Sequence, residues 1–168
     1  MKVKKQLLTL CLVGMACLFF AAAIQAATQV ADVIPLQDPA YEKHTKGIVQ
    51  FSHKKHATEY GGACGDCHHD GDGKPLADQA AFDAFVADGG KVRCIECHKI
   101  PGTVPKDVKK EWRDKKLKKA ETNKLKLEYH AEAVHMNCIT CHKKWNKENK
   151  SKAAPTSCSK CHPKKDKK

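Results

Sequence analysis

Apolar side chains are distributed very unevenly along the 168 residues. A continuous apolar run extends from Leu7 to Ile24, whereas charged residues dominate long stretches of the remaining chain. The run follows a basic start, "MKVKK", and precedes the small residue Ala26, which is the layout of a secretory signal peptide. We therefore expect cleavage after Ala26. The alternative is a retained membrane anchor, because the run is close to the length of a membrane span.

Beyond this run the pattern predicts short helices and little sheet. Apolar residues at helical spacing in "DQAAFDAFVADGG" predict a helix that two glycines end. A second helix is expected to start near Pro105, a favourable first-turn residue, and a third to run from about Leu125 to His135. A short strand pair near "KGIVQF" is the one strand signal.

Large apolar side chains are scarce in the predicted mature chain. Stretches such as "KDVKKEWRDKKLKKAETNKLK" are mostly charged. A chain of about 140 residues normally buries roughly two-thirds of its unfolded surface. We therefore expect something other than polypeptide to fill the core.

The cysteines supply a candidate for that filling. Two of the ten lie in the predicted signal peptide, and the other eight form four Cys-x-x-Cys pairs, each followed directly by histidine. The motifs are Cys64-Gly-Asp-Cys67-His68, Cys94-Ile-Glu-Cys97-His98, Cys138-Ile-Thr-Cys141-His142 and Cys158-Ser-Lys-Cys161-His162. Cys-x-x-Cys-His is the c-type haem attachment motif: two thiols bond the vinyl groups, and the adjacent histidine reaches the iron.

Three other uses of paired cysteines compete with haem attachment. Zinc sites and disulfide frameworks both use such pairs, but neither requires a histidine after every second cysteine. A thioredoxin-like redox site needs one pair at the start of a helix rather than four. The four repeats therefore predict four covalently attached c-type haems, with the polypeptide wrapped around them.

The second axial position of each iron decides its chemistry. Met136 is the single methionine of the predicted mature chain, so at most one haem can have a methionine ligand. Six histidines lie outside the motifs: His44, His53, His56, His69, His130 and His135. His44 stands apart from the motifs, and a solvated surface position is its simplest interpretation.

The motif order resembles that of the class III cytochromes c, the cytochrome c3 family. The resemblance rests on "FSHKKH", then "CGDCHH", then three further motifs with a histidine shortly before the third, and it covers roughly residues 49–162. It implies that His53, His69 and His56 bind haems 1, 2 and 3, respectively. It also implies a haem 4 ligand upstream of the third motif. His135, three residues before Cys138, is preferred there over His130.

Two features depart from the best-known branch of that family. All four motifs have two residues between their cysteines, and the segment between the second and third motifs is longer. The expected fold is mainly α and irregular, a small multihaem cytochrome c3-like fold with a core of four haems and room for one short β-hairpin. The expected divisions are a signal peptide (1–26), an N-terminal arm (27–50), a tetrahaem domain (51–163) and a basic tail (164–168).

Charge adds information about partners. Cleavage after Ala26 leaves 28 basic and 19 acidic residues, a formal charge of +9. Ionised propionates of four haems would offset this by about −8, and an exported chain does not meet nucleic acid. A local basic patch from 106–126 and 143–168, around haems 3 and 4, suits an acidic redox partner, and a merely solvated face is the alternative.

These features predict a non-enzymatic, periplasmic electron carrier of low potential, without stable membrane insertion. The resemblance implies a periplasmic hydrogenase as donor and a membrane redox complex as acceptor, in anaerobic respiration. Two alternatives are a membrane-anchored quinol-oxidising cytochrome and a multihaem reductase with an open iron position. The reductase needs an iron without a second ligand, whereas the histidines outnumber the positions to be filled.

Overall fold

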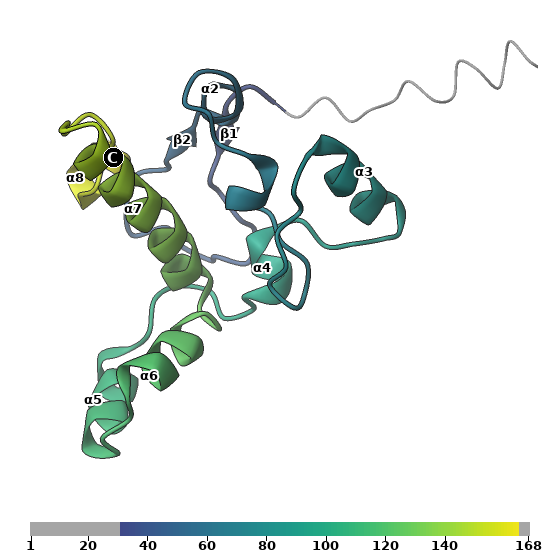
Figure 1. The fold of residues 1–168 in the computed structure, drawn as a ribbon. Coiled ribbons are helices and arrows are strands. Elements are labelled where there is room, and N and C mark those ends of the chain that lie inside the picture. The colour runs from purple at the N-terminus through teal and green to yellow at the C-terminus, as the bar shows by residue number, and fades with distance from the viewer. Residues whose placement is uncertain (1–30, 165–168) are drawn as a thin grey trace, which may run out of the picture. The chain divides into compact units, whose positions relative to one another are not determined.

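Short helices joined by irregular segments make up residues 31–164, the part of the chain that the computed structural model describes (Figure 1). In chain order the elements are β1 (Ile34–Pro35), β2 (Gln50–Phe51), α2 (His53–Thr58), the 3-10 turn η2 (Cys64–Asp66), α3 (Gln79–Ala87), α4 (Cys94–Cys97), α5 (Lys106–Asp114), α6 (Lys119–Lys126), α7 (His130–Glu148) and α8 (Cys158–Cys161). The expected mainly helical and irregular fold is confirmed. The predicted signal peptide, residues 27–30 of the arm and residues 165–168 of the tail lie outside the described residues.

The two strands form one antiparallel pair. Ile34 lies opposite Phe51 and Pro35 opposite Gln50. The strand expected near "KGIVQF" is therefore present, but a long loop, rather than a tight turn, separates it from its partner. The pairing ties the beginning of the described chain to the residues just before α2, and the backbone N–H of Lys54 donates to the carbonyl of Asp32 (3.2 Å).

Helix α3 follows the signals in its sequence. The Asp78 carboxylate accepts a hydrogen bond from the backbone N–H of Ala81 (2.8 Å), which is standard N-terminal capping. At the other end Gly89 has a φ of +80°, and the N–H of Gly90 donates to the carbonyl of Phe85 (2.8 Å). The left-handed glycine ends the helix where the sequence predicts.

Helices α5 and α6 form a basic hairpin before α7. Pro105 lies at the N-terminal boundary of α5, as expected, and Lys116, with a φ of +51°, lies in the turn between the two helices. Ion pairs one turn apart in sequence, Lys110–Asp114 and Lys115–Glu111 (both 2.6 Å), are exposed and add little stability.

The single helix expected from Leu125 to His135 is wrong, because the chain is not helical at Leu127–Tyr129. The segment after α4 pairs with this break: the N–H of Ile100 donates to the carbonyl of Glu128, and the N–H of His130 donates to the carbonyl of Ile100. The carbonyl of Gly102 also accepts from the N–H of Ala131. Tertiary pairing therefore supplies acceptors for the first N–H groups of α7, which no intrahelical carbonyl can reach.

Very little of the polypeptide buries itself. In the described part of the chain the buried residues are Leu76, Val104 and Ala133, with exposed fractions of 8%, 3% and 8%. Within residues 31–164, no buried polar side-chain atom lacks a hydrogen-bond partner. The scarcity of polypeptide core agrees with the sequence expectation that other apolar groups supply most of it.

Candidate functional site

Each Cys-x-x-Cys-His motif folds as helical backbone. Three of them are single turns, η2, α4 and α8, whereas the third lies inside the long helix α7. In the three single turns the backbone N–H of the histidine donates to the carbonyl of the first cysteine, at 2.8 Å in every case. The turn brings the two cysteines, three residues apart, onto one side of the backbone, with the histidine directly after them.

The thiols remain available for attachment. None of the eight cysteines between residues 31 and 164 is in a disulfide. Burial, with smaller contributions from Cys67, Cys94 and Cys161, raises the pKa of the Cys138 thiol to about 11. Burial also raises the pKa of Cys67, and neighbouring Asp66, Cys141 and Cys94 raise it further. Thiols of different motifs therefore influence one another, and Cys138 and Cys67 are neutral at pH 7.

Each motif histidine faces one histidine from outside the motifs. The ring centres are 6.5 Å apart in His53–His68, 6.0 Å in His69–His98, 6.1 Å in His56–His142 and 6.2 Å in His135–His162. Each pair consists of a motif histidine, expected on one side of a haem iron, and a histidine from outside the motifs, expected on the other side of the same iron. All eight candidate iron-ligating histidines are used, each once.

This spacing fits one metal ion between the rings of each pair. Two imidazoles on opposite sides of a metal have ring centres about 6.3 Å apart, given a metal–nitrogen bond of about 2.0 Å and a ring radius of about 1.15 Å. The four observed separations lie between 6.0 and 6.5 Å. Rings that merely stack are free to approach more closely, as Tyr41 and His44 do at 5.4 Å.

Backbone carbonyls orient several of these rings. The Nδ1 of His142 lies 2.6 Å from the carbonyl oxygen of Pro155, and the Nδ1 of His162 lies 2.8 Å from the carbonyl oxygen of Gly47. The Nδ1 of His98 is hydrogen-bonded to the carbonyl oxygen of Leu127. A carbonyl only accepts, so Nδ1 carries the proton and donates. Nε2 is then unprotonated, which is the tautomer that binds a metal.

Helix α2 supplies ligands to two different motifs. His53 faces His68 of the first motif, and His56, three residues later, faces His142 of the third. The Nδ1 of His56 donates to the carbonyl of Ser52 (2.9 Å), and the Phe51 ring lies 4.6 Å from the His56 ring. The helix is short, but its two imidazoles face rings of two different motifs.

The doubled histidine of "CGDCHH" divides between two pairs. His68 faces His53, whereas the next residue, His69, faces His98. The Nδ1 of His69 donates to the Asp70 carbonyl (2.7 Å). Burial, with the nearby His53 and His69, lowers the pKa of His68, which favours the neutral, ligand form of its imidazole.

The two candidates before the third motif have different surroundings. His135 faces His162, whereas the Nδ1 of His130 lies 2.8 Å from the Tyr41 hydroxyl. Burial lowers the pKa of His130, and the nearby Asp38 opposes that effect. Tyr41 also stacks on His44, so both remaining histidines lie beside one tyrosine of the N-terminal arm.

Sequence reasoning missed the partners of the motif rings. The accepting carbonyls of Pro155, Leu127 and Gly47 lie 13, 29 and 115 residues from the histidines they contact. The ring centre of Phe82 is 4.9 Å from that of His68, a contact that the helical pattern of its segment does not predict. No local pattern marks a backbone acceptor, since every residue has one.

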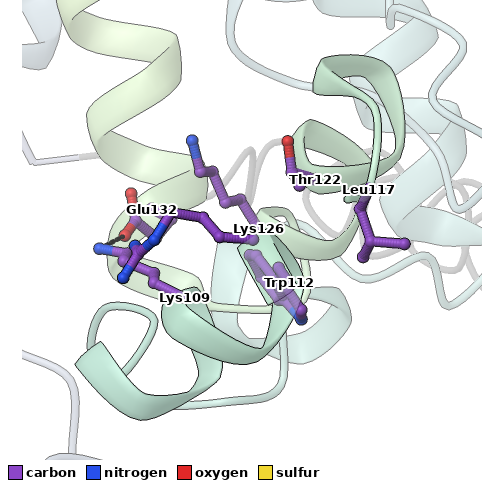
Figure 2. Close-up of a pocket in the computed structure, with 7 residues that line it drawn as sticks. Lys109, Trp112, Leu117, Thr122, Lys126 and Glu132 are labelled. Carbon is purple, nitrogen blue, oxygen red and sulfur yellow. Dashed lines mark hydrogen bonds and ion pairs between the residues drawn. The ribbon is translucent and has the colours of Figure 1, made fainter. Parts of the chain in front are cut away.

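The end of the basic hairpin adjoins the second motif. The carbonyl of Leu127, directly after α6, is hydrogen-bonded to the Nδ1 of His98. The basic patch expected around haems 3 and 4 stays a prediction. A pocket of about 270 Å³ is lined by residues of α5, α6 and α7, and Lys109 pairs there with Glu132 of α7 (3.3 Å). Figure 2 shows the lining side chains. The lining residues include Trp112, Leu117, Thr122 and Lys126 but none of the candidate site residues.

Residues 31–164 contain no helix that is both long and apolar enough to cross a membrane. Within the same residues, no three or more His, Cys, Asp or Glu side chains converge to hold a bare metal ion.

Comparison with known proteins places the sequence among its relatives. Residues 30–162 match the Class III cytochrome C family. A cytochrome c3 of Maridesulfovibrio salexigens is 34% identical over 135 residues, which cover 80% of this chain and 95% of that protein. A cytochrome c3 of Desulfovibrio desulfuricans is 30% identical over 134 residues, with the same coverage of both chains. No solved structure gives a significant match.

Proposed function

The chain belongs to the class III cytochrome c family, and on that premise we propose that it is a periplasmic, low-potential electron carrier in anaerobic respiration. Membership makes it a small multihaem electron-transfer cytochrome with four covalently attached c-type haems. The proposal adds the compartment, the potential range, the ligands and the partners.

We assign attachment to the eight motif cysteines and axial ligation to the eight paired histidines. When bound, each haem supplies a one-electron ferric/ferrous couple, so one chain exchanges up to four electrons. Under this assignment, haem 1 is held by His68 and His53, haem 2 by His98 and His69, haem 3 by His142 and His56, and haem 4 by His162 and His135. His130 and His44 hold no haem.

The observation that supports this assignment is the uniform facing of the four pairs. Every motif histidine has one opposite imidazole at 6.0–6.5 Å between ring centres, which is the separation for two rings on one metal ion. The ring of His130, the competing haem 4 ligand, is paired with that of Tyr41 (5.6 Å), whereas His135 faces the motif histidine His162.

The ligand set supports low potentials. An axial methionine raises the potential of a c-type haem, and none of the four pairs contains one. Full ligation also excludes small molecules from the irons, because both axial positions are filled by the chain. This favours electron transfer over catalysis at the iron.

Continuous chain segments connect the four ligand pairs. Adjacent His68 and His69 join pairs 1 and 2, and α2 joins pairs 1 and 3. Helix α7 carries His135 of pair 4 and His142 of pair 3. The chain thereby fixes neighbouring centres relative to each other, as electron transfer between them requires.

The proposed donor is a periplasmic hydrogenase, which oxidises hydrogen to two protons and two electrons, and the proposed acceptor is a membrane redox complex. The basic hairpin α5–α6 supports an acidic docking partner, since complementary charge steers encounter. The carbonyl of Leu127, directly after α6, is hydrogen-bonded to His98, so the hairpin ends beside a proposed ligand of haem 2.

The test combines mass spectrometry with spectroscopy on the native protein from periplasmic extract. We expect a chain that begins at residue 27 and carries four haems. All four irons should be low-spin, without carbon monoxide binding, and His69→Met should change the spectrum and potential of haem 2 alone. A high-spin ferric signal, ready carbon monoxide binding, or recovery in the membrane fraction would contradict the proposal.

A further inference from the structure

The histidine ring of motif 3 is anchored by the segment that directly follows its own helix. The Nδ1 of His142 donates to the carbonyl of Pro155 at 2.6 Å, in a partly buried position. Pro155 belongs to the irregular segment 151–156 that follows α7. The acceptor of the His142 proton therefore lies on a loop with no regular structure of its own.

One side chain attaches this loop to α7. The amide Nδ2 of Asn146 donates to the carbonyl of Ala154 (2.9 Å), and the N–H of Ala154 donates to the Oδ1 of Asn146 (3.1 Å). Asn146 lies four residues after His142, so both side chains emerge on one face of α7. The clamped residue, Ala154, directly precedes the acceptor, Pro155.

Few other contacts restrain the acceptor. Among the described hydrogen bonds between residues 152–156 and α7, two are made by Asn146 and the third is the His142–Pro155 bond itself. The Cys161 Sγ lies 4.0 Å from the Pro155 carbonyl, and the N–H of Ser151, at the start of the loop, donates to the carbonyl of Asn146 (2.8 Å). Proline has no backbone N–H, so Pro155 cannot donate, and the amide clamp on Ala154 is the side-chain restraint next to its carbonyl.

We propose that Asn146 is a positioning residue that lowers the reduction potential of haem 3 through His142. A strong acceptor at Nδ1 makes the imidazole more electron-donating, which stabilises the ferric over the ferrous iron. Asn146 contacts neither the iron nor the ring, and it acts by holding the Pro155 carbonyl against Nδ1. The inference rests on the proposed ligation of haem 3 by His142.

The experiment replaces Asn146 with Ala in the full holoprotein. The midpoint potential of haem 3 should rise by about 59 mV, a tenfold change in its one-electron redox equilibrium constant, within the range expected for lost outer-shell partners. Haems 1, 2 and 4 should keep their potentials, and all four irons should stay low-spin. Hydrogen exchange of the Ala154 N–H should become faster, which reports release of the loop independently of redox state.

Asn149→Ala is the matched control on the same helix. Its Nδ2 donates to the carbonyl of Trp145 (3.0 Å), within one helical turn and without contact to the loop, so haem 3 should keep its potential. If Asn146→Ala yields no holoprotein, the same measurements on Pro155→Gly test whether the position of this carbonyl sets the haem 3 potential. Glycine keeps the carbonyl but loosens the loop, and a smaller positive shift is expected.

Two outcomes separate the possible failures. Faster exchange at Ala154 with an unchanged haem 3 potential would overturn the role of Asn146, even with every iron low-spin. Loss of the low-spin signal in the wild-type protein would instead contradict the ligand assignment on which the inference rests.

Discussion

Helix α2 contributes to two ligand pairs that differ in the hydrogen bonding and the relative orientation of their rings. His53 faces His68 and His56 faces His142, with ring centres 6.5 and 6.1 Å apart. In the third pair both Nδ1 atoms have carbonyl acceptors, Ser52 and Pro155. In the first pair, among the hydrogen bonds of residues 31–164, neither Nδ1 has one.

Aromatic rings pack on both pairs, but the two pairs differ in ring orientation. Phe51 and Phe82 lie beside His53 and His68 (6.0 and 4.9 Å), and Phe51 and Tyr60 lie beside His56 (4.6 and 5.4 Å). The rings of the third pair are nearly parallel, at 27°, whereas those of the first meet at 63°. Identical motifs can thus have ligands of unequal basicity, because the second shell comes from distant parts of the chain.

Removal of all haem should erase both sites together. Since only three described residues are buried, the apoprotein lacks a core of its own and should lose most of its helix, as metal-dependent small domains do. Circular dichroism of mature chain made without haem, beside the holoprotein in the same buffer, measures this. Native-like helix content in the apoprotein would contradict it.

Methionine at either α2 ligand should affect one site and spare the other. His53→Met should raise the potential of haem 1 and His56→Met that of haem 3, each on the order of 0.2 V, well inside the roughly 0.8 V that axial ligands span. Potentiometric titration followed by NMR of the haem methyl groups assigns each shift, and each variant is the control for the other. A shift at the same haem in both variants would contradict the division of α2.

In the wild-type protein the unequal hydrogen bonding should separate the two potentials. Haem 1, whose ligands lack carbonyl acceptors, should be reduced before haem 3, by about 59 mV for each tenfold difference in equilibrium constant. The same NMR titration gives the order. EPR identifies the sites, because nearly parallel rings make haem 3 the more rhombic signal. Reduction of haem 3 first would show that other charges outweigh the hydrogen bonds.

Local signals in the sequence were enough for the parts that depend on a few neighbouring residues. The four motif turns need only adjacent residues, and α3 has its capping Asp78 and terminating Gly89 within its own sequence. The break between α6 and α7 needed the segment after α4, whose carbonyls at Ile100 and Gly102 meet the new helix. Helix propensity, which is a property of single residues, does not predict that pairing.

The site divides in the same way. The histidine pairs agree with the pairing that the family resemblance implied, yet the assignment of each ligand stays a prediction until an iron is observed between the rings. The acceptors Leu127, Pro155 and Gly47 were unpredictable, because a carbonyl is common to every residue and only the fold selects one.

Helix α7 has a consequence for how the chain tolerates change. His135 and His142 are seven residues apart, close to two full turns and about 10.5 Å along the axis. The number of residues between the two histidines therefore sets the separation and the relative direction of two ligand pairs. A substitution at Met136 or Asn137 that keeps the helix leaves this spacing unchanged, but one inserted residue there turns His135 by about 100° relative to His142. For this stretch, length is a stricter requirement than composition.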